Sequence, residues 1–209
     1  MKILVVAATL PEIGPVYDHF GLPHEQFQST PGFDLLITGV GMTATAYALG
    51  KQLTTPYQLV LNLGIAGSFD HSIPLGSVVS ITSDTFSELG AENKNEFLPI
   101  DQLGFGKSNY CINPPSLPHT QNLRTVPGIT VNTVHGNTES IQTVSTRLQP
   151  VTESMEGAAV FYSCEQAAVT CLQVRSISNY VEERNKEAWK IGLAIKNLNH
   201  WAIDFLTNT

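Results

Sequence analysis

Residues 58–70 read QLVLNLGIAGSFD, an apolar run followed by a glycine-rich segment. Its first part, Leu59 to Leu63, is a continuous apolar run, which is typical of a strand that is covered on both faces. The glycine-rich segment Gly64-Ile-Ala-Gly-Ser68 follows and is predicted to be a loop whose backbone can approach a ligand closely. It matches neither GxGxxG nor GxxxxGK[ST], so it predicts neither a dinucleotide-binding fold nor a P-loop.

The same kind of apolar run recurs along the chain and alternates with helical patterns. The other predicted strands are Ile3 to Ala8, Leu35 to Thr38, Val78 to Thr82, Ile129 to Val134 and Val174 to Ile177. The predicted helices are Met42 to Leu53, Met155 to Thr170 and Lys186 to Leu206. This alternation predicts an α/β fold with a parallel or mixed sheet. We expect one domain over 1–209, with Asn93 to Gln121 as an insertion or long loop.

The composition excludes several classes of protein. The chain has 209 residues, 42% of them hydrophobic and 14% charged, against about 25% charged in an ordinary soluble protein. Between Asp34 and Asp84 the only charged residues are Lys51 and Asp70. High hydrophobicity argues against disorder, and a net charge of −7 argues against nucleic-acid binding.

A membrane or secreted location is not expected either. No run of about 18 apolar residues is present, and MKILVVAATLPE lacks the pattern of a secretory signal. Three cysteines without a CxxC motif fit a reduced, cytoplasmic protein, and Cys164 and Cys171 are predicted to be buried core thiols.

Small, polar or acidic residues follow the predicted strands. These places are Thr9 to Glu12, Gly64 to Ser68, Ser83 to Phe86, His135 to Thr138 and Ser178-Asn179. Because ligands bind outside the carboxyl ends of strands in such folds, we expect one convergent polar site.

Two acidic residues are candidates for chemistry. Glu12 could serve as a general base for a water molecule, or could be a first-turn acid that interacts with the helix dipole. Glu156, in SMEGAA (154–159), opens a small, apolar helix. Its ionised carboxylate can only accept hydrogen bonds and therefore suits a sugar diol, whose hydroxyls donate them. A favourable interaction with the helix dipole explains an acid at this position equally well.

Two further patterns have a functional and a simpler interpretation. The Asn179 carboxamide offers a donor and an acceptor, which match N7 and the 6-substituent of a purine. It could instead cap the next helix, with Glu182 three residues on. Gly39-Val-Gly41 could bind an anion at a helix N-terminus or simply form a tight turn.

Several longer motifs together carry a family resemblance. They are MKILVVAATLPE (1–12), ITGVGMTATAYAL (37–49), NLGIAGSF (62–69), SMEGAAVFYSC (154–164) and VRSISNYVEERNKEAW (174–189). In their order and spacing the chain resembles the purine nucleoside phosphorylase and nucleosidase superfamily, most closely the methylthioadenosine and S-adenosylhomocysteine nucleosidases. Within that group, SDTFSELGAENKNEFLPIDQLGFG (83–106) resembles the futalosine hydrolases. The resemblance implies a single-domain, mixed-sheet, three-layer fold.

The resemblance also implies roles for individual residues. Glu12 would activate the attacking water, and Met155 and Glu156 would contact the ribose. Gly67 and Ser68 would lie near the ribose and the water.

The purine side of the site follows from the same resemblance. Phe86 and the loop from His135 to Thr138 would contact the base or the 5′ substituent, and Asn179 would face the purine. The adenine-specific relatives have an aspartate at the position of Asn179, which delivers a proton to N7. Asparagine cannot do so, and general acid catalysis contributes about 10²–10⁴-fold. A 6-oxopurine that already carries a proton on N7 would tolerate the loss, so hypoxanthine is the expected leaving group.

The expected activity is hydrolysis of the N-glycosidic bond of futalosine in menaquinone biosynthesis, with no cofactor or metal and with a homodimeric assembly. Phosphorolysis is disfavoured, because no arginine occurs in the loops after the first predicted strands. Another purine nucleosidase and a non-catalytic purine-binding protein stay open as alternatives. The carboxylate of the 5′ substituent needs a partner, for which Arg184, Arg124, Lys107 and backbone amides are candidates.

Overall fold

A computed structural model describes residues 2–94, 96–113, 115 and 117–208. Its helices are α1 (Leu10–His19), α2 (Met42–Gln52), α3 (Thr138–Leu148), α4 (Gly157–Gln166) and α5 (Ile191–Thr207), with 3₁₀ turns at Pro118–Thr120 and Lys186–Ala188. Its strands are β1 (Ile3–Ala7), β2 (Phe27–Ser29), β3 (Phe33–Ile37), β4 (Leu59–Ser68), β5 (Val78–Phe86), β6 (Gly90–Asn93), β7 (Glu96–Pro99), β8 (Asn109–Cys111), β9 (Arg124–Thr130), β10 (Thr152–Ser154) and β11 (Cys171–Tyr180).

The main sheet is mixed and closes on itself at one end. Its order is β10-β9-β5-β11-β4-β1-β3-β2, with β8 added to β5. Strand β10 pairs in parallel with β9 and also antiparallel with the end of β4, where Glu153 lies opposite Gly67. Because β10 joins both sides, the carboxyl ends of β4 and β11 lie near β10 rather than at an open edge.

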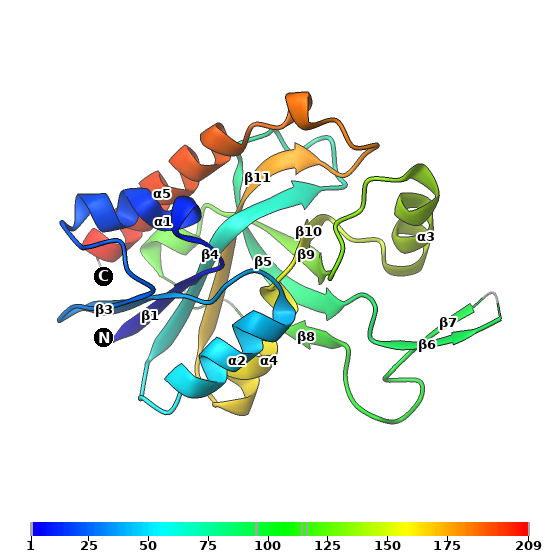
Figure 1. The fold of residues 1–209 in the computed structure, drawn as a ribbon, viewed down its shortest axis with the longest axis horizontal. Helices are drawn as coiled ribbons and strands as arrows, with labels where there is room; N and C mark the ends of the chain where they lie inside the picture. Colours follow the sequence, from blue (N-terminus) through cyan, green and yellow to red (C-terminus); the bar gives the residue numbers. More distant parts are fainter. Residues whose placement is uncertain (1, 95, 114, 116, 209) are drawn as a thin grey trace.

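Helices cover both faces of the sheet, as Figure 1 shows. α1 and α5 pack together on one face, and α2 and α4 pack together on the other. Within β1, Ile3 and Val5 face the α1–α5 core, while Leu4 and Val6 face the α2–α4 core. Burial on both faces explains why the strands read as continuous apolar runs, and the expected three-layer α/β fold is confirmed.

The structure corrects several predicted boundaries. Gly64 to Ser68 is not a loop, because β4 continues through Ser68 and pairs with β11 and β10. Likewise β5 continues through Phe86. The last long helix begins at Ile191 rather than Lys186, and α4 extends over Gly157–Gln166 rather than 155–170.

Other elements were absent from the prediction. α1 contains Pro11 and Pro15, and its short amphipathic pattern gave no helical signal. The segment predicted as an insertion or loop includes β7 and β8, although residues 95, 114 and 116 within it lie outside the described residues. β7 pairs with β6 in a hairpin that projects from the body in Figure 1.

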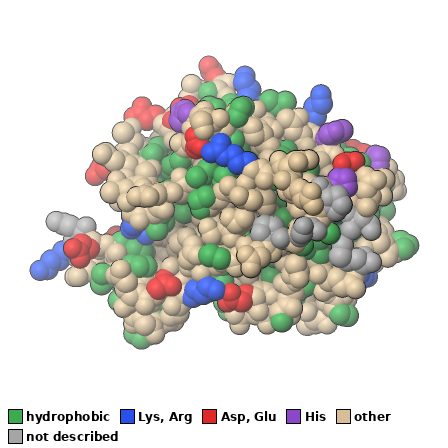
Figure 2. All heavy atoms as spheres, turned by 180° about the vertical axis from the view of Figure 1, so that it is seen from behind, with side chains coloured by type: hydrophobic (Ala, Val, Ile, Leu, Met, Phe, Trp, Pro, Cys, Tyr) green, Lys and Arg blue, Asp and Glu red, His purple; other side chains and the backbone are tan. Residues whose placement is uncertain are grey.

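The surface reflects the low charge content. On the face shown in Figure 2, Lys, Arg, Asp and Glu side chains are scattered among uncharged ones. Among the described residues no helix combines the length and apolarity needed to cross a membrane, and no group of His, Cys, Asp and Glu suits a metal ion.

Candidate active site

A cavity of about 400 Å³ lies where the carboxyl ends of β1, β4 and β11 meet β10 and the start of α5. Four of the five predicted strand-end segments reach it, through Thr9 and Glu12, Gly67, His135, and Asn179. The fifth, Ser83 to Phe86, does not line it; β5 continues there as a paired strand, and Phe86 lines a separate hollow. The closed end of the sheet therefore gathers polar groups from distant parts of the sequence.

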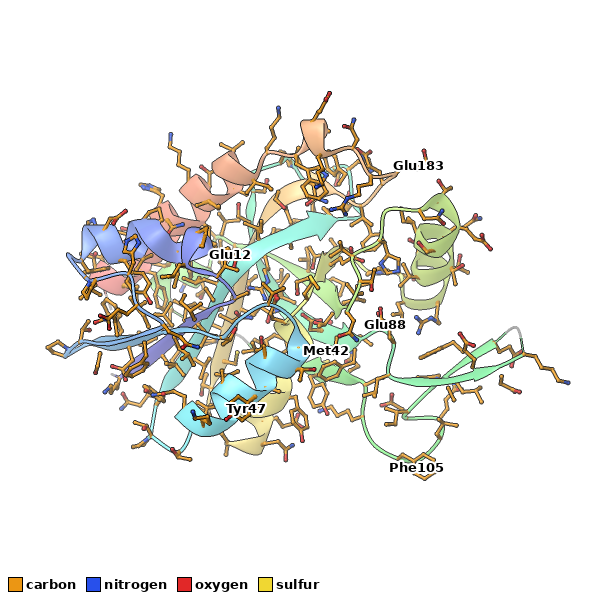
Figure 3. All side chains as sticks on the ribbon, viewed as in Figure 1. Glu12, Met42, Tyr47, Glu88, Phe105 and Glu183 are labelled. Atoms are coloured by element: carbon orange, nitrogen blue, oxygen red, sulfur yellow. The ribbon has the colours of Figure 1, made fainter. Side chains whose placement is uncertain are left out.

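Glu12 lies in the first turn of α1 and lines this cavity (Figure 3). Its Oε2 accepts hydrogen bonds from Thr9 N (3.0 Å) and Thr9 Oγ1 (2.9 Å), and its Oε1 accepts one from Ile65 N (3.2 Å). Burial raises the pKa of the Glu12 carboxyl, and these donors together with Arg175 oppose that shift. The carboxylate thus both closes the helix start and faces the cavity, so the two interpretations of Glu12 are compatible.

Arg175 is the main residue that the sequence analysis gave no role. It is only 2% exposed and approaches Glu12 from β11. A Cβ at Gly64 would lie 2.7 Å from Arg175 Nη1 and 3.1 Å from Glu12 Oε1, so glycine is needed there. Within the described residues Arg175 Nε and Nη2 have no hydrogen-bond partner. Arg175 does not line the cavity, so its recorded influence on the site is the electrostatic one on Glu12.

Met155 and Glu156 line the cavity directly before α4. Glu156 Oε1 accepts a hydrogen bond from Gly41 N (2.9 Å) at the start of α2. The anion that Gly39-Val-Gly41 was predicted to bind is therefore, in this structure, the protein's own carboxylate. Gly41 has φ = +93°, a conformation that favours glycine. This bond holds Glu156 and leaves its second oxygen for another donor.

A network of buried, hydrogen-bonded polar side chains contacts the start of α4, next to this part of the site. Asp84 accepts hydrogen bonds from Thr130 Oγ1 (2.8 Å) and Gln173 Nε2 (2.7 Å), and Gln173 Oε1 accepts one from Asn62 Nδ2 (2.8 Å). Thr130 Oγ1 in turn accepts from Ala158 N (2.7 Å), at the first turn of α4. Burial raises the pKa of Asp84 to about 6.

The start of α4 is therefore fixed by Asp84. A Cβ at Gly157 would lie 2.0 Å from Asp84 Oδ2, which only glycine avoids. Because Gly157 follows Glu156 directly, the buried carboxyl also determines where Glu156 lies.

Asn179 faces the cavity from a bulge near the end of β11. Its Oδ1 accepts from Ser178 Oγ (2.8 Å), and its Nδ2 donates to Tyr180 O (3.0 Å). The alternative of a helix cap is wrong, since Asn179 belongs to a strand and the next 3₁₀ turn is capped by Asn185. A Cβ at Gly67 would lie 3.2 Å from Asn179 Nδ2, so the two residues adjoin.

Two predicted contacts fall outside the cavity. Ser68 is fully buried, and its Oγ donates to Asp70 O (3.0 Å) and accepts from Asp70 N (3.1 Å), which turns it away from the site. Phe86 packs edge-on against Tyr110 and lines a separate hollow beside α2 and α4. Neither side chain lines the cavity, and both belong to strands, β4 and β5, whose side chains alternate between faces.

The loop before α3 does reach the cavity. His135 N donates to Glu153 Oε1 (2.9 Å), and His135 Nδ1 contacts Glu153 Oε2. Glu153 is 4% exposed, and burial raises its pKa while His135 opposes that shift. Arg184 and Trp189 line the cavity on the side of α5, with the guanidinium 5.1 Å from the indole centroid. Sequence reasoning gave Glu153 and Trp189 no role.

Comparisons with known proteins identify the family. The model of the phosphorylase superfamily matches residues 35–206. A futalosine hydrolase from Streptomyces coelicolor is 33% identical over 177 residues, covering 80% of this chain and 75% of the relative. A futalosine hydrolase from Acidothermus cellulolyticus is 32% identical and covers 96% of this chain and 88% of the relative.

Solved structures agree on the fold. Futalosine hydrolase of Helicobacter pylori superposes with a TM-score of 0.82 at 16% identity, over 100% of this chain and 98% of the other. An H. pylori methylthioadenosine nucleosidase variant with 5′-methylthioadenosine in its active site gives 0.81 at 18% identity, over 100% and 99%. With the sequence matches above, the chain belongs to the phosphorylase superfamily and, within it, to the futalosine hydrolases.

Proposed function

We propose that this protein hydrolyses the N-glycosidic bond of futalosine and releases hypoxanthine. Futalosine is a hypoxanthine nucleoside with a carboxyphenyl-bearing group on its 5′ side. The observation that carries the proposal is the convergence of Glu12, Glu156 and Asn179 on one cavity in a chain of this family.

The geometry supports a distinct role for each of these residues. Glu156, held by Gly41 N, keeps one carboxylate oxygen for the ribose hydroxyls, next to Met155. Glu12 accepts a proton from the attacking water, and the positive charge of the nearby buried Arg175 favours the ionised form of Glu12 that this role requires. The C1′–N9 bond breaks through an oxocarbenium-like sugar, and its electron pair goes to the purine.

Asn179 supports a 6-oxopurine as the leaving group. Its carboxamide cannot protonate N7, but rotation of the amide away from Ser178 and Tyr180 would let Nδ2 donate a hydrogen bond to O6. This bond stabilises the negative charge that develops on hypoxanthine as the C1′–N9 bond breaks, and the released base then takes a proton from solvent. An adenine nucleoside would lack a proton donor at this position. Hydrolysis of methylthioadenosine or of a 6-amino analogue of futalosine is therefore the weaker reading.

Phosphorolysis is the second candidate, and Arg175 is the observation that favours it. A buried guanidinium with free donors could hold phosphate. Arg175 does not line the cavity, however, and the carboxylates of Glu12, Glu153 and Glu156 that do line it would oppose a phosphate dianion there.

One experiment separates these readings. Futalosine, inosine and methylthioadenosine are each incubated with the protein, with and without phosphate, and free base is measured by chromatography. We expect hypoxanthine from futalosine without phosphate. Release that requires phosphate would establish a phosphorylase, and preferential release of adenine would establish a different nucleosidase.

The remaining proposals concern the setting of the activity. We expect a cytoplasmic enzyme of menaquinone biosynthesis with one domain over 1–209. We also expect a homodimer, as the resemblance to this family implies. Sedimentation velocity would test the assembly, and a monomer at micromolar concentration would refute it.

A further inference from the structure

The cavity has an unbalanced set of charges. Three carboxylates line it, from Glu12, Glu153 and Glu156, and each already has partners within the protein. Such a cavity repels an anionic substrate unless a cation is available to it. The proposed substrate carries a carboxylate on its 5′ side, so this cation is needed.

Arg184 is the cation that fits. It lines the cavity, and no carboxylate of the described residues lies within ion-pair distance of it. The other two candidates are engaged elsewhere, Arg124 with Asp70 (2.7 Å) and Lys107 with Glu165 (2.6 Å), and neither lines the cavity.

The backbone around Arg184 is tied in place. Arg184 N donates to Gly136 O (3.3 Å), and Thr138 Oγ1 donates to Glu183 Oε1 (2.7 Å). Figure 3 shows Glu183 in the loop that approaches α3. These two bonds join the loop after β11 to the loop before α3, so the guanidinium starts from a fixed backbone position at the cavity.

Apolar groups complete the surroundings of Arg184. Its Cζ lies 5.1 Å from the Trp189 ring centroid, and Ile191 and Ile195 line the same cavity. A guanidinium over an aromatic ring keeps its edge N–H groups free for a carboxylate. An aromatic ring of a ligand can pack against the indole and the aliphatic side chains beside this cation.

We propose that Arg184, with Trp189 and Ile191, forms the subsite that takes an aromatic carboxylate on the 5′ side of the substrate. This inference rests on the proposed function and adds the residue that determines specificity for the acidic substituent. His135 is a poorer partner for that carboxylate, because its Nδ1 is already committed to Glu153.

The test compares futalosine with its methyl ester, which keeps the aromatic ring and loses the charge. For Arg184→Met we expect kcat/KM on futalosine to fall roughly 10- to 100-fold, mainly through KM, as for loss of a hydrogen bond to a charged group. The loss on the methyl ester should be several-fold smaller. Arg124→Met removes the same charge away from the cavity and is the matched control, with equal small effects on both substrates.

The outcomes separate this inference from the proposed function. Equal losses on the acid and the ester, or no loss, overturn the Arg184 subsite and leave futalosine hydrolysis standing. A wild-type protein that releases no hypoxanthine from futalosine overturns both. Arg184→Glu gives a second readout, since reversal of the charge should raise KM for the acid further and leave the ester near its Arg184→Met value.

Discussion

Asp84→Asn tests whether ionisation of the buried Asp84 carboxyl destabilises the folded protein. Asp84 is 1% exposed, and its carboxylate accepts bonds from Thr130 and Gln173. Burial raises its pKa from 3.8 to about 6, against the opposing effects of those bonds and of Arg175. Asparagine has nearly the same shape and cannot ionise.

The size and the sign of the effect on stability follow from the shift in the pKa of Asp84. Two pKa units correspond to roughly 3 kcal/mol. Below pH 3.8 the carboxyl is protonated in both the folded and the unfolded state, so it adds no pH dependence. Above about pH 6 it is ionised in both states, and the ionised form destabilises the folded state. The free energy of unfolding of the wild type, relative to Asp84→Asn, should therefore fall by roughly 3 kcal/mol between pH 4 and pH 7.

The assay is urea unfolding of the wild type and each variant at pH 3, 4, 5, 6 and 7, at one protein concentration. Asp101→Asn is the matched control, because hydrogen bonds from Ser108 lower the pKa of Asp101. The free energy of unfolding of the wild type, relative to Asp101→Asn, should rise as the pH rises from 3 to 5. This trend is opposite to the one expected for Asp84. Parallel pH profiles for the wild type and Asp84→Asn would refute the claim that Asp84 ionises in an unfavourable environment.

Three substitutions test the chemistry of the cavity. Glu12→Gln should lower kcat by about 10²–10⁴-fold and leave hypoxanthine binding, measured by calorimetry, nearly intact. A kcat near the wild-type value would exclude Glu12 as the base. Asn179→Asp supplies a proton donor and should raise the kcat/KM ratio of methylthioadenosine to inosine; an unchanged ratio would mean that Asn179 does not read the purine. Gly64→Ala places a Cβ 2.7 Å from Arg175 Nη1 and should lower kcat more than tenfold with an unchanged circular dichroism spectrum; full activity would show that the position of the guanidinium is unimportant.

The fold was largely predictable because both faces of the sheet are buried. Continuous apolar runs such as Ile3 to Ala8 identified the central strands. The error at Gly64 to Ser68 has a physical cause, since glycine normally weakens a strand. Here the glycines avoid side chains that cross the strand, namely Arg175 at Gly64, and Asn179 and Val181 at Gly67. Those contacts come from β11 and its following residue, more than a hundred positions away.

The site was predictable where a residue follows a strand. Glu12 and Asn179 were found in this way, and Glu156 was found from its place at the start of a small, apolar helix. The structure brings all three to the same cavity. Glu153 was missed because its role depends on β10 pairing with both β9 and β4, which short-range patterns do not reveal. Arg175 did leave a signal, because a charged residue inside an apolar strand needs a buried partner.

Arg175 also changes the reason for choosing water over phosphate. The sequence disfavoured phosphorolysis because the early loops contain no arginine, yet a buried arginine of β11 lies close enough to Glu12 to influence its pKa, although it does not line the cavity. The choice therefore rests on the charges that are present. Glu12 and Arg175 flank the same glycine, and Glu153 and Glu156 add two more acids to the cavity lining. A dianion in this cavity would face three carboxylates, whereas a neutral water can donate a hydrogen bond to Glu12.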